Sequence, residues 1–233
     1  MIIENIPYNQ TFLGQMAYKK TNQKIPAVLV AHAWGGRDEF ACKKAQMLAE
    51  LGYLGFALDM YGDAKTGSNT EENSKLMGPL MADREILKDR ILAAFEKVKT
   101  LPMVDPTKIG AIGFCFGGLC VLDLARSGAD VKGVVSFHGL LNKPKILAKN
   151  PIKAKILALH GHDDPMVNPA ETQDFMNEMT QALADWQIHI YGNTMHAFTN
   201  PQANDRSFGN VYDKKADQRS FQSMKSFFEE VFS

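Results

Sequence analysis

The sequence predicts an α/β fold in which a mostly parallel central sheet carries helices on both faces. Short apolar segments rich in Val, Ile and Leu alternate with longer amphipathic segments, and they lack the strict alternation of half-exposed strands. The 233 residues, 45% hydrophobic and 22% charged, also have the composition of an ordinary globular protein. We therefore expect a single domain over residues 1–233.

Six strands are predicted, at residues 27–32, 54–59, 108–114, 133–138, 155–160 and 187–191. Five helices are predicted between and after them, at residues 39–51, 84–99, 117–125, 169–183 and 213–232. In 84–99, for example, Ile91, Phe95 and Val98 fall on one apolar stripe opposite charged side chains. The segment 61–79 is rich in turn formers, and we interpret it as a surface excursion near a site.

Charge and cysteine content narrow the class of protein. The 26 basic and 26 acidic residues cancel, which argues against a nucleic-acid partner, because such proteins carry a basic face. No apolar run approaches the roughly 20 residues that span a bilayer, and the first residues do not form a signal peptide. Three cysteines fit reduced thiols better than a disulfide framework. We expect a cytoplasmic monomer or weak homodimer with no membrane partner.

The strongest chemical signal is the segment GFCFGG, which places Cys115 between the strand 108–114 and the helix 117–125. This is a nucleophile elbow, G-x-nucleophile-x-G, with cysteine in the nucleophile position. The turn lifts the central side chain above the sheet, and the N-terminus of the following helix favours negative charge on the sulfur. Cys42 and Cys120 have no such context, and we interpret both as structural residues.

A thiol nucleophile needs a base and a group that orients the base. In this type of fold the order along the chain is nucleophile, acid, histidine. Asp164 lies in the loop GHDDPMV after the strand 155–160, and His196 lies in the loop GNTMHAF after the strand 187–191. Both loops leave the sheet edge that also carries Cys115. We assign Asp164 as the acid and His196 as the base, with Asp163 as a rival for the acid.

The loop after the first predicted strand, AWGG, is the expected source of one backbone N–H for an oxyanion. The candidate donors are the backbone N–H groups of Trp34 and Phe116. A tight turn with no catalytic role is the alternative for the Trp34 loop. Among the other histidines, His32 is expected to support this loop and His138 to support the edge of the site. His189 is expected on the polar face of an edge strand.

These segments together resemble the dienelactone hydrolase family of the α/β-hydrolases. The resemblance is carried by GFCFGG, LDMYGD, GHDDPMV and HAF, and it covers nearly the whole chain. It implies an α/β-hydrolase fold with a Cys-Asp-His triad at Cys115, Asp164 and His196. It also implies a small ester or lactone as substrate, no cofactor and no metal.

Two positions depart from the pattern of family members that act on dienelactone. Those members carry a glutamate in the oxyanion loop, where this chain has Ala33, and an arginine just beyond the histidine, where it has Asn200. Arg84 and Arg206 are the alternative cations for a substrate carboxylate. Trp34, Phe116 and Phe198 instead suggest an apolar or aromatic-lined pocket. The candidate pocket residues are Ala33, Phe198 and Arg84. We therefore expect uncharged substrates to be preferred.

Two other functions remain open. His160, His162 and Asp164 supply three ligands of an H-x-H-x-D-H pattern, which would make the protein a zinc hydrolase, although its last position is Pro165. The other alternative is a redox sensor or binding protein in which Cys115 is a sensing thiol. Cys115 and Cys120 do not form a C-x-x-C pair, which disfavours a dithiol cycle.

Overall fold

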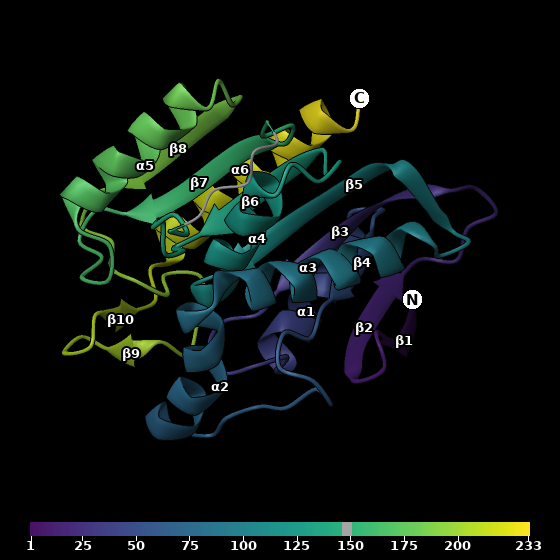
Figure 1. Cartoon of the computed structure of the whole chain (residues 1–233), viewed down its shortest axis with the longest axis horizontal. Coiled ribbons are helices and arrows are strands. Elements are labelled where there is room, and N and C mark those ends of the chain that lie inside the picture. Colours follow the sequence, from purple (N-terminus) through teal and green to yellow (C-terminus); the bar gives the residue numbers. More distant parts are fainter. Residues whose placement is uncertain (146–150) are drawn as a thin grey trace. The chain divides into compact units, whose positions relative to one another are not determined.

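A computed structural model describes residues 1–145 and 151–233. The elements in chain order are β1 (Ile2–Tyr8), β2 (Phe12–Tyr18), β3 (Ile25–Ala31), α1 (Glu39–Glu50), β4 (Leu54–Ala57), α2 (Thr70–Ala82), α3 (Arg84–Lys99), β5 (Val104–Phe114), α4 (Phe116–Arg126), β6 (Gly133–Phe137), β7 (Lys155–Gly161), α5 (Pro169–Gln181), β8 (Trp186–Tyr191), β9 (Asn204–Asp205), β10 (Asn210–Val211) and α6 (Lys214–Val231) (Figure 1).

Eight of the strands follow one another in the order β1-β2-β4-β3-β5-β6-β7-β8, and β9 and β10 pair separately. The pairs β3–β4, β6–β7 and β7–β8 are parallel, whereas β1–β2 and β2–β4 are antiparallel. The predicted α/β fold with a mostly parallel sheet is therefore confirmed. The chain divides into two compact units, Met1–Ile112 and Gly113–Ser233, which are described in turn.

All six predicted strands and five predicted helices are present, with shifted ends, but five further elements were not predicted. β1 is mostly exposed and shows no clear alternation, so its pattern is not that of a buried strand. α2 begins inside the predicted excursion 61–79 and ends beyond it. This helix buries Leu80 alone and contains Pro79, so it shows no apolar stripe. β9 and β10 have two residues each, which is too short for any periodic signal.

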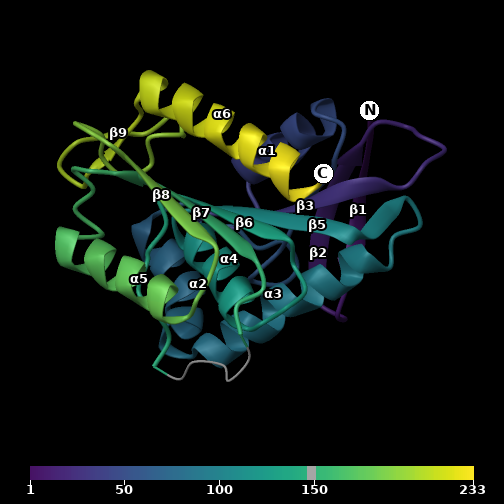
Figure 2. The ribbon, with the colours of Figure 1, turned by 90° about the horizontal axis from the view of Figure 1, so that it is seen from above.

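In the first unit, α1 and α3 cover opposite faces of the strands (Figure 2). α1 lies very close to β4, because a Cβ atom on Gly55 would come within 2.1 Å of the Ala45 carbonyl oxygen. The turn after β4 is held by the buried Asp59 carboxylate, which accepts backbone N–H bonds from Leu13, Tyr61, Gly62 and Ala64. The first aspartate of the segment LDMYGD therefore has a structural role.

In the second unit, α4 and α5 lie on one face of β6, β7 and β8, and α6 lies on the other (Figure 2). α6 packs against β6 at Gly133, where an added Cβ would lie 2.8 Å from a ring carbon of Phe227. His189, on the edge strand β8, makes a 3.2 Å hydrogen bond to the Ser223 hydroxyl of α6. The helices thus cover both faces of the strands in each unit, as predicted.

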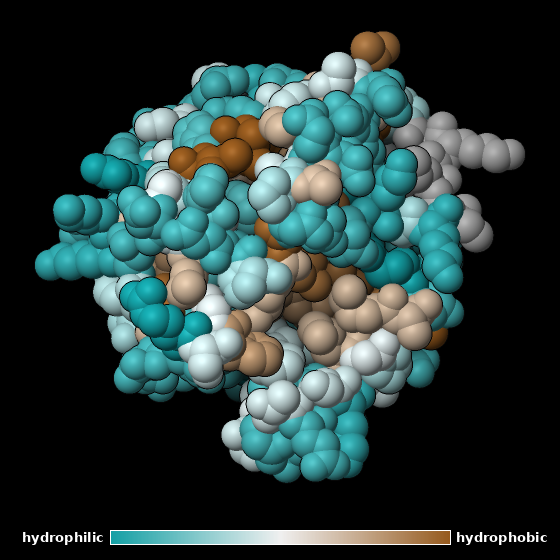
Figure 3. Space-filling view, turned by 90° about the vertical axis from the view of Figure 1, so that its left-hand side faces the viewer, coloured by the Kyte–Doolittle hydropathy of each residue, from teal (hydrophilic) through white to brown (hydrophobic). Residues whose placement is uncertain are grey.

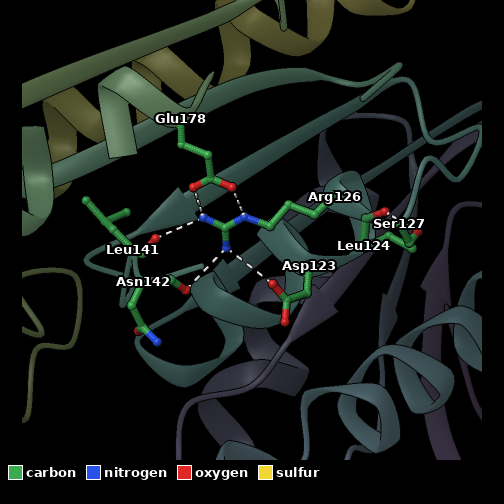
Figure 4. A network of polar contacts seen from close by, with 7 residues as sticks. All are labelled: Asp123, Leu124, Arg126, Ser127, Leu141, Asn142 and Glu178. Carbon is green, nitrogen blue, oxygen red and sulfur yellow. Dashed lines mark hydrogen bonds and ion pairs between the residues drawn. The ribbon is translucent and has the colours of Figure 1, made fainter. Parts of the chain in front are cut away.

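A buried ionic network joins α4 to α5 (Figure 4). The Arg126 guanidinium donates two hydrogen bonds to Glu178, of 2.8 and 2.9 Å, and one of 3.2 Å to Asp123. It also donates to the backbone carbonyls of Leu141 and Asn142, which follow β6. Because every side of the guanidinium has a partner, its buried charge is compensated by hydrogen bonds and by two carboxylates.

The surface shown in Figure 3 is mostly hydrophilic, with hydrophobic side chains in smaller groups. Large exposed hydrophobic side chains are spread over several elements: Met1, Ile3, Ile86, Leu183, Ile190 and Phe208. Within residues 1–145 and 151–233, no helix combines the length and the apolar character that crossing a membrane requires.

Candidate active site

Cys115 occupies a sharp turn between β5 and α4, as the elbow pattern predicts. Its backbone has φ 54° and ψ −117°, a conformation that a residue with a side chain adopts only under strain. Its N–H donates to the Phe137 carbonyl at 3.1 Å, which ties the turn to the end of β6. The residue is half-buried, so the thiol retains access to a reacting partner.

Two glycines make this turn possible. A Cβ atom on Gly113 would lie 1.9 Å from the Gly117 carbonyl oxygen, inside the first turn of α4. A Cβ on Gly118 would lie 2.6 Å from the Cα of Gly139 in the loop after β6. The glycines of GFCFGG therefore permit a close approach between strand, helix and loop, and the nucleophile position follows from that packing.

The acid loop after β7 presents Asp164 and turns Asp163 away. Asp164 is buried, and its Oδ1 accepts the Met166 N–H at 2.8 Å. Asp163 lies at the surface and pairs with the exposed ring of His162 at 2.7 Å. The structure therefore places the assigned acid inside the protein and the rival acid in solvent.

His196 interacts with both the predicted acid and the predicted nucleophile. Its Nδ1 donates a 2.7 Å hydrogen bond to Asp164 Oδ2, and both side chains are at most 2% exposed. Nε2 is also buried and has no nitrogen or oxygen partner among the described residues. The Cys115 side chain interacts with the ring by charge and by a hydrogen bond.

The charge of this cluster favours a protonated imidazole. Burial alone lowers the pKa of His196, but the negative sulfur of Cys115 and the hydrogen bond to Asp164 raise it to about 10. An imidazolium held between a carboxylate and a thiolate is the arrangement that activates a cysteine at neutral pH. The three groups can therefore form a nucleophilic thiolate and also supply a proton to a leaving group.

The acid and histidine loops are joined by their backbones. His162 N–H donates to the Tyr191 carbonyl and Asp163 N–H to the Thr194 carbonyl, both at 2.9 Å. The two loops approach so closely that a Cβ on Gly161 would lie 2.5 Å from the Thr194 carbonyl oxygen. The ends of β7 and β8 therefore hold the acid and the base side by side.

A second imidazole supports the site. His138 is buried, and its ring meets the His196 ring edge-on at 5.1 Å between centroids. Its Nε2 makes a 2.8 Å hydrogen bond to the Thr199 hydroxyl, a contact that sequence reasoning missed. Phe198, predicted to line the pocket, is fully buried and packs against His138 and Tyr191. Its pocket role stays a prediction.

The remaining predicted residues occupy defined positions within their own units. Phe116 is buried and is the first residue of α4, directly after the nucleophile. In the first unit, the loop of Ala33 and Trp34 is held by its carbonyls: His32 Nδ1 binds that of Ala33 at 2.6 Å, and the Tyr61 hydroxyl donates to that of Trp34 at 2.8 Å. Arg84 begins α3 and is half-buried.

The supporting role expected of His32 has a clear geometry. Its Nε2 accepts the Met60 N–H at 3.1 Å, so Nδ1 carries the proton of a neutral ring and donates it to the Ala33 carbonyl. Burial lowers the pKa of His32, although the Ala33 carbonyl opposes this effect. The neutral tautomer thereby fixes the direction of the Ala33–Trp34 peptide.

The zinc pattern does not assemble. The His160 ring is buried and burial lowers its pKa, whereas His162 faces solvent and pairs with Asp163. Across residues 1–145 and 151–233, no cluster of three or more potential ligands is arranged around a common point. Cys120 is fully buried in α4 and Cys42 is half-buried in α1, as expected for structural residues.

The chain is similar to known proteins along most of its length. A family model described as "Dienelactone hydrolase family" matches residues 13–232. A Yersinia pestis protein that carries a provisional carboxymethylenebutenolidase name is 31% identical over 74% of this chain and 68% of its own length.

Two solved structures resemble the whole chain. The structure titled "m3DLH" has 34% identity and a TM-score of 0.94, over 100% of this chain and 99% of its own. A dienelactone hydrolase-like promiscuous phosphotriesterase from metagenomic libraries has 33% identity and a TM-score of 0.92, over 99% of this chain and 98% of its own.

Proposed function

The chain belongs to the dienelactone hydrolase family, and on this premise we propose that it cleaves small esters or lactones through a Cys115–His196–Asp164 triad. That it is a hydrolase of ester or lactone bonds follows from the family. One observation carries the proposed mechanism. His196 donates from Nδ1 to the buried Asp164 at 2.7 Å, and the sulfur of a strained elbow cysteine interacts with the same ring.

The proposed reaction has two steps. The Cys115 thiolate attacks the carbonyl carbon, a C–S bond forms, and the departing alkoxide takes a proton from the His196 imidazolium. Neutral His196 then removes a proton from water, the resulting hydroxide attacks the thioester, and the C–S bond breaks. The carboxylic acid leaves, and the thiolate–imidazolium pair is restored. Asp164 fixes the tautomer and the orientation of His196 throughout.

The oxyanion of each tetrahedral intermediate is proposed to accept the backbone N–H groups of Phe116 and Trp34. Phe116 is favoured because it begins α4, and the first N–H groups of a helix have no acceptor within that helix. Trp34 is favoured because its peptide is held in one direction by His32. Preorganised donors of this kind need no rearrangement as charge develops.

The substrate is proposed to be uncharged. A buried carboxylate needs a cation beside it, and the position beyond His196 that carries arginine in other family members is Asn200 here. Arg206, a candidate cation in the second unit, lies exposed in the turn between β9 and β10.

The test compares kcat/KM for a neutral aryl ester, a neutral lactone and a dienelactone carboxylate. We expect the neutral compounds to be favoured by at least about tenfold, because the carboxylate would lose hydration without gaining a partner. A preference for the carboxylate that disappears in Arg84→Ala or Arg206→Ala would contradict this specificity. Failure to hydrolyse any of the three would contradict the proposed function itself.

A neutral phosphotriester is a second candidate substrate. The observation that favours it is the 33% identity to a promiscuous phosphotriesterase over nearly the whole chain. Here Cys115 would attack phosphorus, an S–P bond would form, and the aryloxide would leave before water released the phosphodiester. Release of nitrophenolate from a nitrophenyl phosphotriester, absent in Cys115→Ala, is the expected result. Equal release by that variant would exclude this activity for Cys115.

A further inference from the structure

The hairpin formed by β9 and β10, residues 204–211, is a compact element beside the histidine loop (Figure 1). Asn210 pairs with Asp205 and Val211 with Asn204. The Asp205 carboxylate accepts the Ser207 hydroxyl at 2.6 Å and the Phe208 N–H at 3.0 Å, which closes the turn. These local bonds give the hairpin a fixed shape although it is short and exposed.

One end of this hairpin binds the histidine loop. The Val211 N–H donates to the carbonyl of His196 at 3.0 Å, and Asn210 forms a parallel bridge with His196. The contact is made by the backbone of the proposed base itself. A movement of β10 would therefore move the peptide that carries the imidazole.

Gly209, at the end of the hairpin turn, packs against the acid loop. Gly209 has φ +80°, and a Cβ atom there would lie 2.2 Å from Cγ and 2.7 Å from Cδ of Pro165. Pro165 directly follows Asp164, and its ring cannot turn aside as a flexible side chain would. One short segment thus touches the acid loop and the histidine loop at once.

These two contacts complement the direct bonds between the loops. The bonds from His162 and Asp163 to the histidine loop lie on the strand side of Asp164. The contact with Pro165 lies on its far side, where the Met166 N–H also binds the Asp164 carboxylate, so the hairpin adds a contact from outside the acid loop. A productive acid–base pair needs positions held within a fraction of an ångström, which support from both sides provides.

We propose that the β9–β10 hairpin is a positioning element for the triad, with Gly209 as the residue that sets the spacing between Asp164 and His196. The proposal rests on the proposed function, because it gives these two residues a catalytic partnership. It assigns no chemistry to the hairpin itself. Gly209 acts through Pro165, and Val211 acts through the backbone of His196.

The experiment places a methyl group at this contact with Gly209→Ala and uses two control variants. Gly52→Ala reproduces the backbone strain of a positive φ, +94°, with nothing within 4 Å of the added Cβ, and it should keep kcat within about twofold. The other control is Gly192→Ala. Gly192 lies in the loop after β8, and nothing is within 4 Å of the position where its Cβ would lie. For Gly209→Ala we expect kcat to fall by about 10- to 100-fold with little change in KM, because binding is unaffected while the acid is displaced. Gly192→Ala should keep kcat within about twofold.

A spectroscopic readout separates positioning from loss of structure. The proton shared by His196 Nδ1 and Asp164 should give a far-downfield proton resonance, which should shift or broaden in Gly209→Ala and not in Gly192→Ala. Pro165→Ala removes the two ring atoms that clash and should restore both kcat and the resonance in the double variant. Pro165→Ala alone, which opens a gap, should show a smaller loss of kcat.

The outcomes are distinguishable. An unchanged resonance and kcat in Gly209→Ala would overturn the positioning role, as would a loss that Pro165→Ala does not relieve. If Gly209→Ala does not fold, Pro165→Ala alone decides, and wild-type kcat with a wild-type resonance in that variant would overturn the proposal. Undiminished hydrolysis by Cys115→Ala would instead refute the proposed function and leave the resonance result standing.

Discussion

Two buried charged clusters lie in the same unit, residues 113–233, and they differ in how completely their polar atoms are paired. Arg126 donates to Glu178, Asp123 and two backbone carbonyls, so its guanidinium is surrounded by acceptors. His196 is equally buried, but one ring nitrogen binds Asp164 and the other has no nitrogen or oxygen partner within residues 1–145 and 151–233. Burial and charge are common to both clusters.

The two clusters differ because the histidine cluster contains Cys115, which has a strained backbone and is only half-buried. The groups that surround the Arg126 guanidinium are backbone carbonyls and carboxylates, and α4 is a regular helix that ends at this residue. Cys115 has a positive φ and retains access to solvent. We conclude that the arginine cluster stabilises the fold, and we propose that the histidine cluster performs the reaction.

The largest expected difference between the clusters comes from removing the nucleophile. Cys115→Ala should lower kcat/KM for a neutral ester by at least about 10⁴-fold, because the covalent route is lost. It should not destabilise the fold strongly, since Cys115 is not fully buried. Steady-state kinetics and thermal unfolding measure the two effects. Cys120→Ala is the matched control, and near-normal turnover by Cys115→Ala would point to a water or metal mechanism instead.

Replacing the acid should have the next largest effect. Asp164→Asn preserves shape but cannot hold the Nδ1–H tautomer of His196, so kcat should fall by about 10³- to 10⁴-fold. Asp163→Asn alters an exposed carboxylate that pairs with His162 and should change kcat by less than about threefold. The comparison is made at one pH with the same ester. If Asp163→Asn lowered kcat more than Asp164→Asn, Asp163 would be the acid.

The arginine cluster should respond in stability and not in turnover. Glu178→Gln leaves the buried Arg126 charge undercompensated and should cost about 3–5 kcal/mol of unfolding free energy. Denaturant titration measures this loss. At temperatures where the variant stays folded, kcat should remain within about threefold of wild type. A loss of kcat with unchanged stability would show that the Arg126 network takes part in the reaction, and it would contradict the assignment of a purely structural role.

The positions of Cys115, Asp164 and His196 after β5, β7 and β8 could be predicted from the sequence, because parallel strands end at a common edge. Their catalytic roles stay a prediction. The choice of Asp164 over Asp163 rested on the neighbouring Pro165 and Val167, and the structure separates the two by burial. The glycines of the elbow could also be predicted, because strand, helix and loop approach too closely there for a side chain.

Other parts of the site could not be predicted, for physical reasons. The two-residue strands of the β9–β10 hairpin carry no periodic signal, and its contact with the acid loop joins Gly209 to Pro165, 44 positions apart in sequence. The bond between His138 and Thr199 joins side chains 61 positions apart. α2 was hidden because its turn-forming residues cap and begin a helix that has almost no apolar face.

The account's central claim is that Cys115 carries the acyl group, and mass spectrometry of acid-quenched enzyme tests it most directly. During turnover of a nitrophenyl ester, the account predicts a mass increase of one acyl group on the peptide that contains Cys115. The adduct should be absent in Cys115→Ala and should accumulate in Asp164→Asn, where deacylation is slowed. Full turnover without any adduct, or an adduct confined to Cys42 or Cys120, would contradict the claim.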